Sequence, residues 1–253
     1  MMKRLLVLAL LALPLVADDT AFFKAISAND VATVRTMLAA DPALANAHSV
    51  KGRSAVTVAL FINVGEGFLD PHSNEILQMI LALKPPLDLF ETAAIGERAQ
   101  LEKMLKSDPS AATKRSSFGW TLLHLSAFGG NVPNTELLLA KGADVSARAQ
   151  TKFLNTPLQT ALLSGQYATA KLLLDHGADA LVRQAQGFAP MHEAAILGRK
   201  DLVQLLLDHG AELNSRSDSG LTPLAEALRG KHEECAQWMK AKGAVIEPVA
   251  DID

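Results

Sequence analysis

The chain has little cysteine, few aromatic residues and no cluster of basic residues. One of its 253 residues is cysteine, so no disulfide bond can form within the chain. Aromatic residues make up 5% of the sequence while alanine and leucine are abundant, and this balance favours helices over sheets. The formal net charge is −3 and lysine and arginine form no run. We therefore expect no nucleic-acid partner.

Long hydrophobic runs are also absent, and this bears on the first 17 residues. The segment MMKRLLVLALLALPLVA begins with two basic residues, continues with an apolar stretch over 5–13 and ends at Ala17. That stretch is shorter than the roughly 20 residues that span a bilayer. A basic start, a short apolar middle and a small final residue are typical of a secretory signal peptide. We expect export with cleavage near residue 17 and no membrane span afterwards; an uncleaved anchor or a buried first helix is the alternative.

The second half of the chain repeats itself. Glycine followed by alanine recurs with spacings of 35, 33 and 33 residues, at Gly142, Gly177, Gly210 and Gly243. The segments TLLH, TPLQ, APMH and TPLA begin at residues 121, 156, 189 and 222, with the same three spacings. A fixed period of this length indicates a stack of similar supersecondary units.

These residues resemble the ankyrin repeat, a 33-residue unit with the signature T-P-L-H-x-A. Four units over 114–246 match well, and the segment 187–214 matches almost throughout. Residues 18–113 keep the pattern in degenerate form, with an insertion near 63–72 and an Asp-Pro pair in two units where the later ones have Gly-Ala. Residues 247–253 form a tail.

The resemblance implies an all-α ankyrin-repeat solenoid of about seven helix-turn-helix units joined by short hairpins, in a single domain over 18–253. Each signature position has a physical role. Threonine caps the first helix, proline fits its first turn, and glycine provides the left-handed backbone that ends the second helix. The third unit follows Leu87 and Asp88 so closely that the hairpin before it must be missing.

The histidines fit this scaffold better than a reactive site. His176 and His209 occupy equivalent places on adjacent units, and packed helices lie about 8–10 Å apart, too far for both rings to bind one zinc ion. The resemblance implies that His124 and His192 bond the backbone of the neighbouring connection. Cys235 is expected in the core, with a reactive thiol as the alternative.

No catalytic constellation stands out. The sequence contains no Ser/His/Asp arrangement, no phosphate-binding glycine loop and no carboxylate pair of the kind that hydrolases use. We therefore expect no catalytic residues, no metal site, no cofactor and no enzymatic activity.

The candidate partner-binding residues lie on the predicted hairpins. Large apolar side chains there would form a contact patch if exposed, or would fold back onto neighbouring hairpins. Arginines recur at the repeat period, and such a ladder would engage an acidic partner unless it serves the scaffold. The insertion near 63–72 is either a binding loop or a tolerated addition. The candidates are Phe118, Trp120, Arg148, Phe153, Arg183, Phe188, Arg216 and Leu221, with Asn155 and Arg115 at equivalent positions.

The resemblance implies protein–protein interaction through hairpin tips and the concave face. Together with the signal peptide, which has a bacterial pattern, it leads us to expect a monomeric periplasmic protein. Such a protein would hold, protect or regulate an enzyme or another component of the envelope. The alternative is a secreted effector or toxin-related factor that binds a protein of a host or a competitor.

Overall fold

The computed structural model describes residues 20–62 and 71–246. The predicted signal peptide (1–17), the tail (247–253) and most of the predicted insertion (63–72) lie outside these residues. The α-helices are α2 (Ala21–Ser27), α3 (Val31–Ala40), α4 (Ala55–Leu60), α5 (Glu75–Ala82), α6 (Leu89–Ile95), α7 (Arg98–Ser107), α8 (Leu122–Phe128), α9 (Val132–Ala140), α10 (Pro157–Leu163), α11 (Tyr167–Asp175), α12 (Pro190–Ile196), α13 (Lys200–Asp208), α14 (Pro223–Arg229) and α15 (Glu233–Ala241). Short 3-10 helices cover Pro42–Asn46, Pro71–Ser73 and Pro109–Thr113. Two isolated β-bridges are the extended pairings among the described residues.

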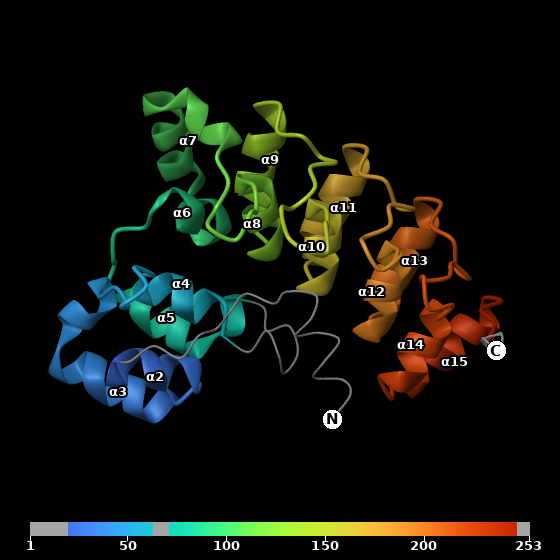
Figure 1. Cartoon of the computed structure of the whole chain (residues 1–253), viewed down its shortest axis with the longest axis horizontal. Helices are drawn as coiled ribbons and strands as arrows, with labels where there is room; N and C mark the ends of the chain where they lie inside the picture. The colour runs from blue at the N-terminus through green and yellow to red at the C-terminus, as the bar shows by residue number, and fades with distance from the viewer. Residues whose placement is uncertain (1–19, 63–70, 247–253) are drawn as a thin grey trace.

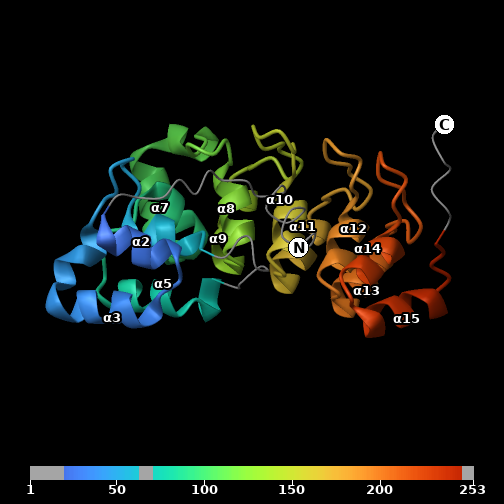
Figure 2. The ribbon, with the colours of Figure 1, turned by 60° about the horizontal axis from the view of Figure 1, so that its bottom comes forward.

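The helices pack as seven successive pairs within the described residues, from α2 with α3 to α14 with α15. The first helices of neighbouring pairs, α6, α8, α10, α12 and α14, also pack against one another. Figure 1 shows that the pairs follow a curved path, and Figure 2 shows loops from the later pairs on one side of it. The predicted all-α solenoid of helix-turn-helix units is confirmed. The side that carries the connections 115–121, 148–155, 183–188 and 216–221 is called the hairpin face.

The signature residues act locally as their chemistry predicts. The Thr156 hydroxyl accepts a hydrogen bond from the backbone N–H of Gln159, and Pro157 occupies the first position of α10. Gly177 follows α11 with φ of +86°, the left-handed conformation in which a side chain would be strained. Ala194 and Ala195 are fully buried, so the helices around α12 approach closely.

One continuous hydrophobic core extends through the stack, with buried residues from every helix pair. It is continuous because the apolar face of each pair is buried only by packing against the neighbouring pairs. The regular stacking changes once, between the second pair and the third. There, Leu83–Asp88 connects α5 to α6 without a hairpin, as predicted, and contains Pro85 and Pro86. No helix among the described residues is long and apolar enough to cross a membrane.

Candidate functional site

The recurring arginines join successive hairpins of the later units. In Arg115, Arg148 and Arg183 the guanidinium donates to a carbonyl of its own hairpin and to the carbonyl of the equivalent arginine one unit further on. Arg115 donates to the Arg148 carbonyl at 3.0 Å, Arg148 donates to the Arg183 carbonyl at 2.7 Å, and Arg183 donates to the Arg216 carbonyl. Arg148, Arg183 and Arg216 are nevertheless exposed. The ladder therefore supports the scaffold while presenting positive charge on the hairpin face.

Arg148→Ala is expected to lower the free energy of unfolding by about 1–2 kcal/mol, because the Leu154 and Arg183 carbonyls both lose their donor. Arg148→Lys should recover only part of this loss, since both bonds leave one guanidinium nitrogen, Nη1, and the more strongly hydrated ammonium group does not reproduce its fixed planar geometry. Urea unfolding followed by circular dichroism measures the change. Lys106→Ala, which removes an exposed ion pair with Glu102 within α7, is the control and should cost less than about 1 kcal/mol. Equal losses in the two alanine variants would contradict a linking role for the ladder.

The large apolar side chains of the hairpins are not an exposed patch. Trp120, Phe153 and Phe188 expose only 1%, 3% and 4% of their surface, so of the two alternatives that the sequence left open, these side chains fold back into the stack. Phe118 and Leu221 are half-buried, and Asn155 is buried. The physical reason is that neighbouring hairpins lie against one another and turn these side chains inward, which was the alternative considered from the sequence.

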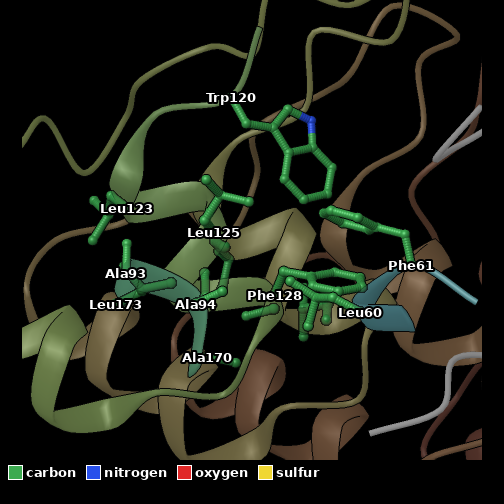
Figure 3. Close-up of a cluster of buried hydrophobic side chains, with 14 of the residues drawn as sticks. Leu60, Phe61, Ala93, Ala94, Trp120, Leu123, Leu125, Phe128, Ala170 and Leu173 are labelled. Atoms are coloured by element: carbon green, nitrogen blue, oxygen red, sulfur yellow. The ribbon is translucent and has the colours of Figure 1, made fainter. Parts of the chain in front are cut away.

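Trp120 belongs to an aromatic cluster that crosses the site of the missing hairpin. Its ring lies 5.9 Å from that of Phe61, at the end of α4, and 5.7 Å from that of Phe128 in α8. Phe61 also contacts Phe118 at 5.6 Å. Figure 3 shows the rings of Trp120, Phe61 and Phe128 gathered together. The cluster therefore joins two units that are separated by a third.

The signature histidines serve the backbone, as the resemblance implied. The Nε2 atom of His124 hydrogen-bonds to the Asn155 carbonyl at 3.0 Å, and that of His192 to the Leu221 carbonyl at 2.9 Å. At position 159, the glutamine Nε2 donates to the Phe188 carbonyl at 3.3 Å. Burial lowers the pKa of His124 to about 4, which keeps its ring neutral at physiological pH.

The repeated histidines and the single cysteine have equally structural surroundings. The Nδ1 atoms of His176 and His209 each lie 2.9 Å from the backbone carbonyl four residues earlier. The Nε2 atom of His209 also lies 3.3 Å from a carboxylate oxygen of Asp175, at the end of α11. Cys235 is buried, as expected, and burial raises the pKa of its thiol. Across 20–62 and 71–246, no group of three or more His, Cys, Asp and Glu side chains could hold a metal ion.

A recess lies where the missing hairpin would stack. His48 pairs with Ser54 as Arg115 pairs with Thr121, so hairpin 48–54 corresponds to hairpin 115–121 two units later. Between them is a cavity of about 280 Å³, which also includes residues of α4 and the start of α6 in its walls. His48 stands at the ladder position, and its Nδ1 atom lies 3.1 Å from the Asn46 carbonyl. We call this cavity the hairpin recess.

Two carboxylates, Asp88 and Glu91, lie in the recess. Glu91 is buried, and its oxygens accept hydrogen bonds from the hydroxyls of Ser54 and Thr57 and from the backbone N–H of Asp88. The Asp88 carboxylate caps α6 by accepting from the Glu91 N–H at 2.8 Å. Loss of hydration raises the pKa of Asp88, and the nearby Glu91 charge adds to this shift.

The missing hairpin could be located from the sequence, but the recess that it leaves could not. The available signal was the interval of two units between hairpins 48–54 and 115–121, which leaves room between them. Asp88 and Glu91 look like an ordinary helix cap in the sequence, and together they do form a capping box. Their place beside Phe61 and Phe118 depends on tertiary structure.

Comparison with known proteins gives a consistent picture. Family models described as ankyrin repeats match residues 89–184 and 191–239. The chain is 31% identical over 105 residues to palmitoyltransferase akr1 of Neurospora crassa, a match that covers 42% of this chain and 14% of that protein. It is 32% identical over 95 residues to the probable E3 ubiquitin-protein ligase XBOS31 of Oryza sativa, covering 37% of this chain and 21% of that protein.

A human protein named Arf-GAP with coiled-coil, ANK repeat and PH domain-containing protein 2 is 36% identical over 72 residues, or 28% of this chain and 9% of that protein. In all three comparisons, the chain matches only a small fraction of the relative's length. The names of two relatives denote enzymes, but these short matches transfer no activity to this chain.

Proposed function

The chain belongs to the ankyrin-repeat family, and on this premise we propose that it is a non-enzymatic scaffold that binds another protein outside the cytoplasm. The observation that carries the proposal is the hairpin recess, a mixed polar and aromatic cavity of about 280 Å³ in an otherwise regular stack. Side chains from two hairpins, from α4 and α6 and from Leu125 of α8 line it, so a partner there would contact three successive helix pairs together.

The ladder arginines extend this surface toward the C-terminal units. Arg148, Arg183 and Arg216 are exposed, and we propose that they contact acidic groups of the same partner. Phe118 and Leu221 offer half-buried apolar surface beside them. The buried side chains of Trp120, Phe153 and Phe188 support the hairpins by packing beneath this surface. This division assigns contact to the exposed positions and support to the buried ones.

We propose that the chain works in the periplasm, where it holds, protects or regulates an enzyme or envelope component. The support is the N-terminal pattern of two basic residues, a short apolar stretch and Ala17. The mature chain is expected to begin near residue 18 and to act as a monomer. Affinity capture of the mature chain from envelope extract, followed by mass spectrometry, should recover one protein that exchanges with unlabelled chain. Recovery of no such protein would contradict the scaffold proposal.

Export has its own test. Fractionation of cells that naturally make the chain, with N-terminal sequencing, should place a processed form in the periplasm. Deleting residues 1–17 should leave the protein in the cytoplasm. A processed form mainly in the culture medium would favour the secreted effector instead. An unprocessed cytoplasmic protein would contradict export altogether.

A further inference from the structure

We propose that the hairpin recess receives the guanidinium group of an arginine side chain from the partner protein. This inference rests on the proposed function as a protein-binding scaffold, and it names the chemistry that the partner presents. Three features of the recess lead to it: the charge of its carboxylates, the aromatic character of its walls, and its size.

The carboxylates provide the charge. Glu91 is already held by three donors within the chain, so it contributes fixed negative charge at depth. Asp88 forms no ion pair with a described residue, and its carboxylate accepts a hydrogen bond from the Glu91 backbone N–H in the first turn of α6. Loss of hydration is the main cause of the raised pKa of Asp88 and the Glu91 charge a smaller one, and a cation beside Asp88 would offset both.

The walls favour a planar cation over a compact one. Phe61, Phe90 and Phe118 line the recess from α4, α6 and hairpin 115–121. A guanidinium stacks on aromatic rings and binds carboxylates through its planar fork, whereas an ammonium is a strongly hydrated point charge. The Ser117 hydroxyl adds an acceptor at the rim, whereas that of Ser116 already accepts from the backbone N–H groups of Phe118 and Trp120. Arginine is the side chain that uses all of these groups at once.

Size and the remaining charges agree with a single side chain. The cavity of about 280 Å³ falls just below the roughly 300–1,000 Å³ of pockets for drug-sized ligands. Its positive neighbours are Arg53, which is half-buried and engaged in other contacts, and His48 on the same hairpin. An acidic ligand would meet Asp88 and Glu91 as like charges, so it fits the recess less well.

The test uses the chain from residue 18 with N-acetyl-arginine amide as the probe, followed by backbone amide shifts in NMR. We expect saturable shifts confined to residues 48–54, 88–91 and 116–118. Asp88→Asn should weaken binding by about tenfold, the loss expected for one charge-assisted hydrogen bond. Asparagine caps helices as well as aspartate does, so the variant should fold normally. Asp30→Asn, the same change at the cap of α3, is the matched control and should leave binding unchanged.

Two further probes make the proposal falsifiable. N-acetyl-citrulline amide has nearly the same shape without the charge and should bind at least about tenfold more weakly. Equal binding of the citrulline probe, an absence of shifts with the arginine probe, or an unchanged affinity in Asp88→Asn would overturn the arginine assignment. Recovery of a partner by the affinity capture described above, together with any of these results, would leave the scaffold proposal standing. Failure of capture together with saturable arginine binding would contradict the scaffold proposal alone.

Discussion

Replacing Trp120 by alanine is expected to lower the free energy of unfolding by about 3–5 kcal/mol, the cost of removing a fully buried tryptophan. The loss should also divide the unfolding of the chain. Trp120, Phe61 and Phe128 join units across the point where a hairpin is missing. Because the stability of a stacked repeat protein depends on the contacts between neighbouring units, weakening this contact should uncouple the first two helix pairs from the rest. We expect two urea transitions in circular dichroism in place of one.

The other tryptophan provides the control. Trp238 lies half-buried in the last helix, with the Lys242 ammonium 5.3 Å from its ring centre. Trp238→Ala should cost less and should leave the N-terminal units coupled to their neighbours. A Trp120→Ala protein that unfolds like the wild type would show that the aromatic cluster does not hold the stack together.

Replacing Glu193 by glutamine is expected to stabilise the protein at neutral pH. Glu193 is fully buried in α12, with the Gln159 Nε2 donating to one of its oxygens at 3.1 Å. Its other oxygen has no hydrogen-bond partner among the described residues. Burial raises the pKa of this carboxyl well above 4.5, and the Gln159 hydrogen bond offsets only part of that shift. The folded chain therefore keeps Glu193 protonated at pH values where the unfolded chain releases the proton.

The sign of the pH dependence follows from this difference. Stability from Glu193 is fully present below the ordinary glutamate pKa of about 4.5 and is lost as pH rises toward the folded pKa. The loss for one group is at most about 1.4 kcal/mol per pH unit. Glutamine removes it, so the advantage of Glu193→Gln should grow from pH 4 to pH 7. Thermal unfolding across this range measures it, with exposed Glu212→Gln as the control. A constant difference between Glu193→Gln and the wild type would contradict a buried, protonated carboxyl.

The second half of the fold could be predicted because its local signals agree with its packing. Thr156, Pro157 and Gly177 each specify a helix boundary through their own backbone chemistry, and that chemistry acts over a few residues. The absence of a hairpin before α6 was also predictable, because Leu87 and Asp88 leave no length of chain for one. These features depend on sequence distance alone.

The candidate site was less predictable because it depends on contacts between units. Trp120, Phe153 and Phe188 look exposed when hairpins are treated singly, yet stacking buries them. The arginine period was visible, but the carbonyls that receive each guanidinium lie about 33 residues further along the chain. Phe61 and Phe128 occupy the same position of their units, seven residues after Ser54 and Thr121, but nothing in the sequence indicates that both rings meet Trp120. The recess combines all of these long-range contacts, and no local pattern encodes it.

The central claim is that the hairpin face with its recess binds a partner protein. The most direct test places a photo-crosslinking amino acid at Ser117, which is exposed on the rim of the recess, in cells that naturally make the chain. A second variant carries the same photo-crosslinking group at Lys103, which is exposed on α7. The account predicts one dominant crosslinked protein from Ser117, lost with added Asp88→Asn, and none from Lys103. Crosslinking of the same proteins from both positions, or of none from Ser117, would contradict it.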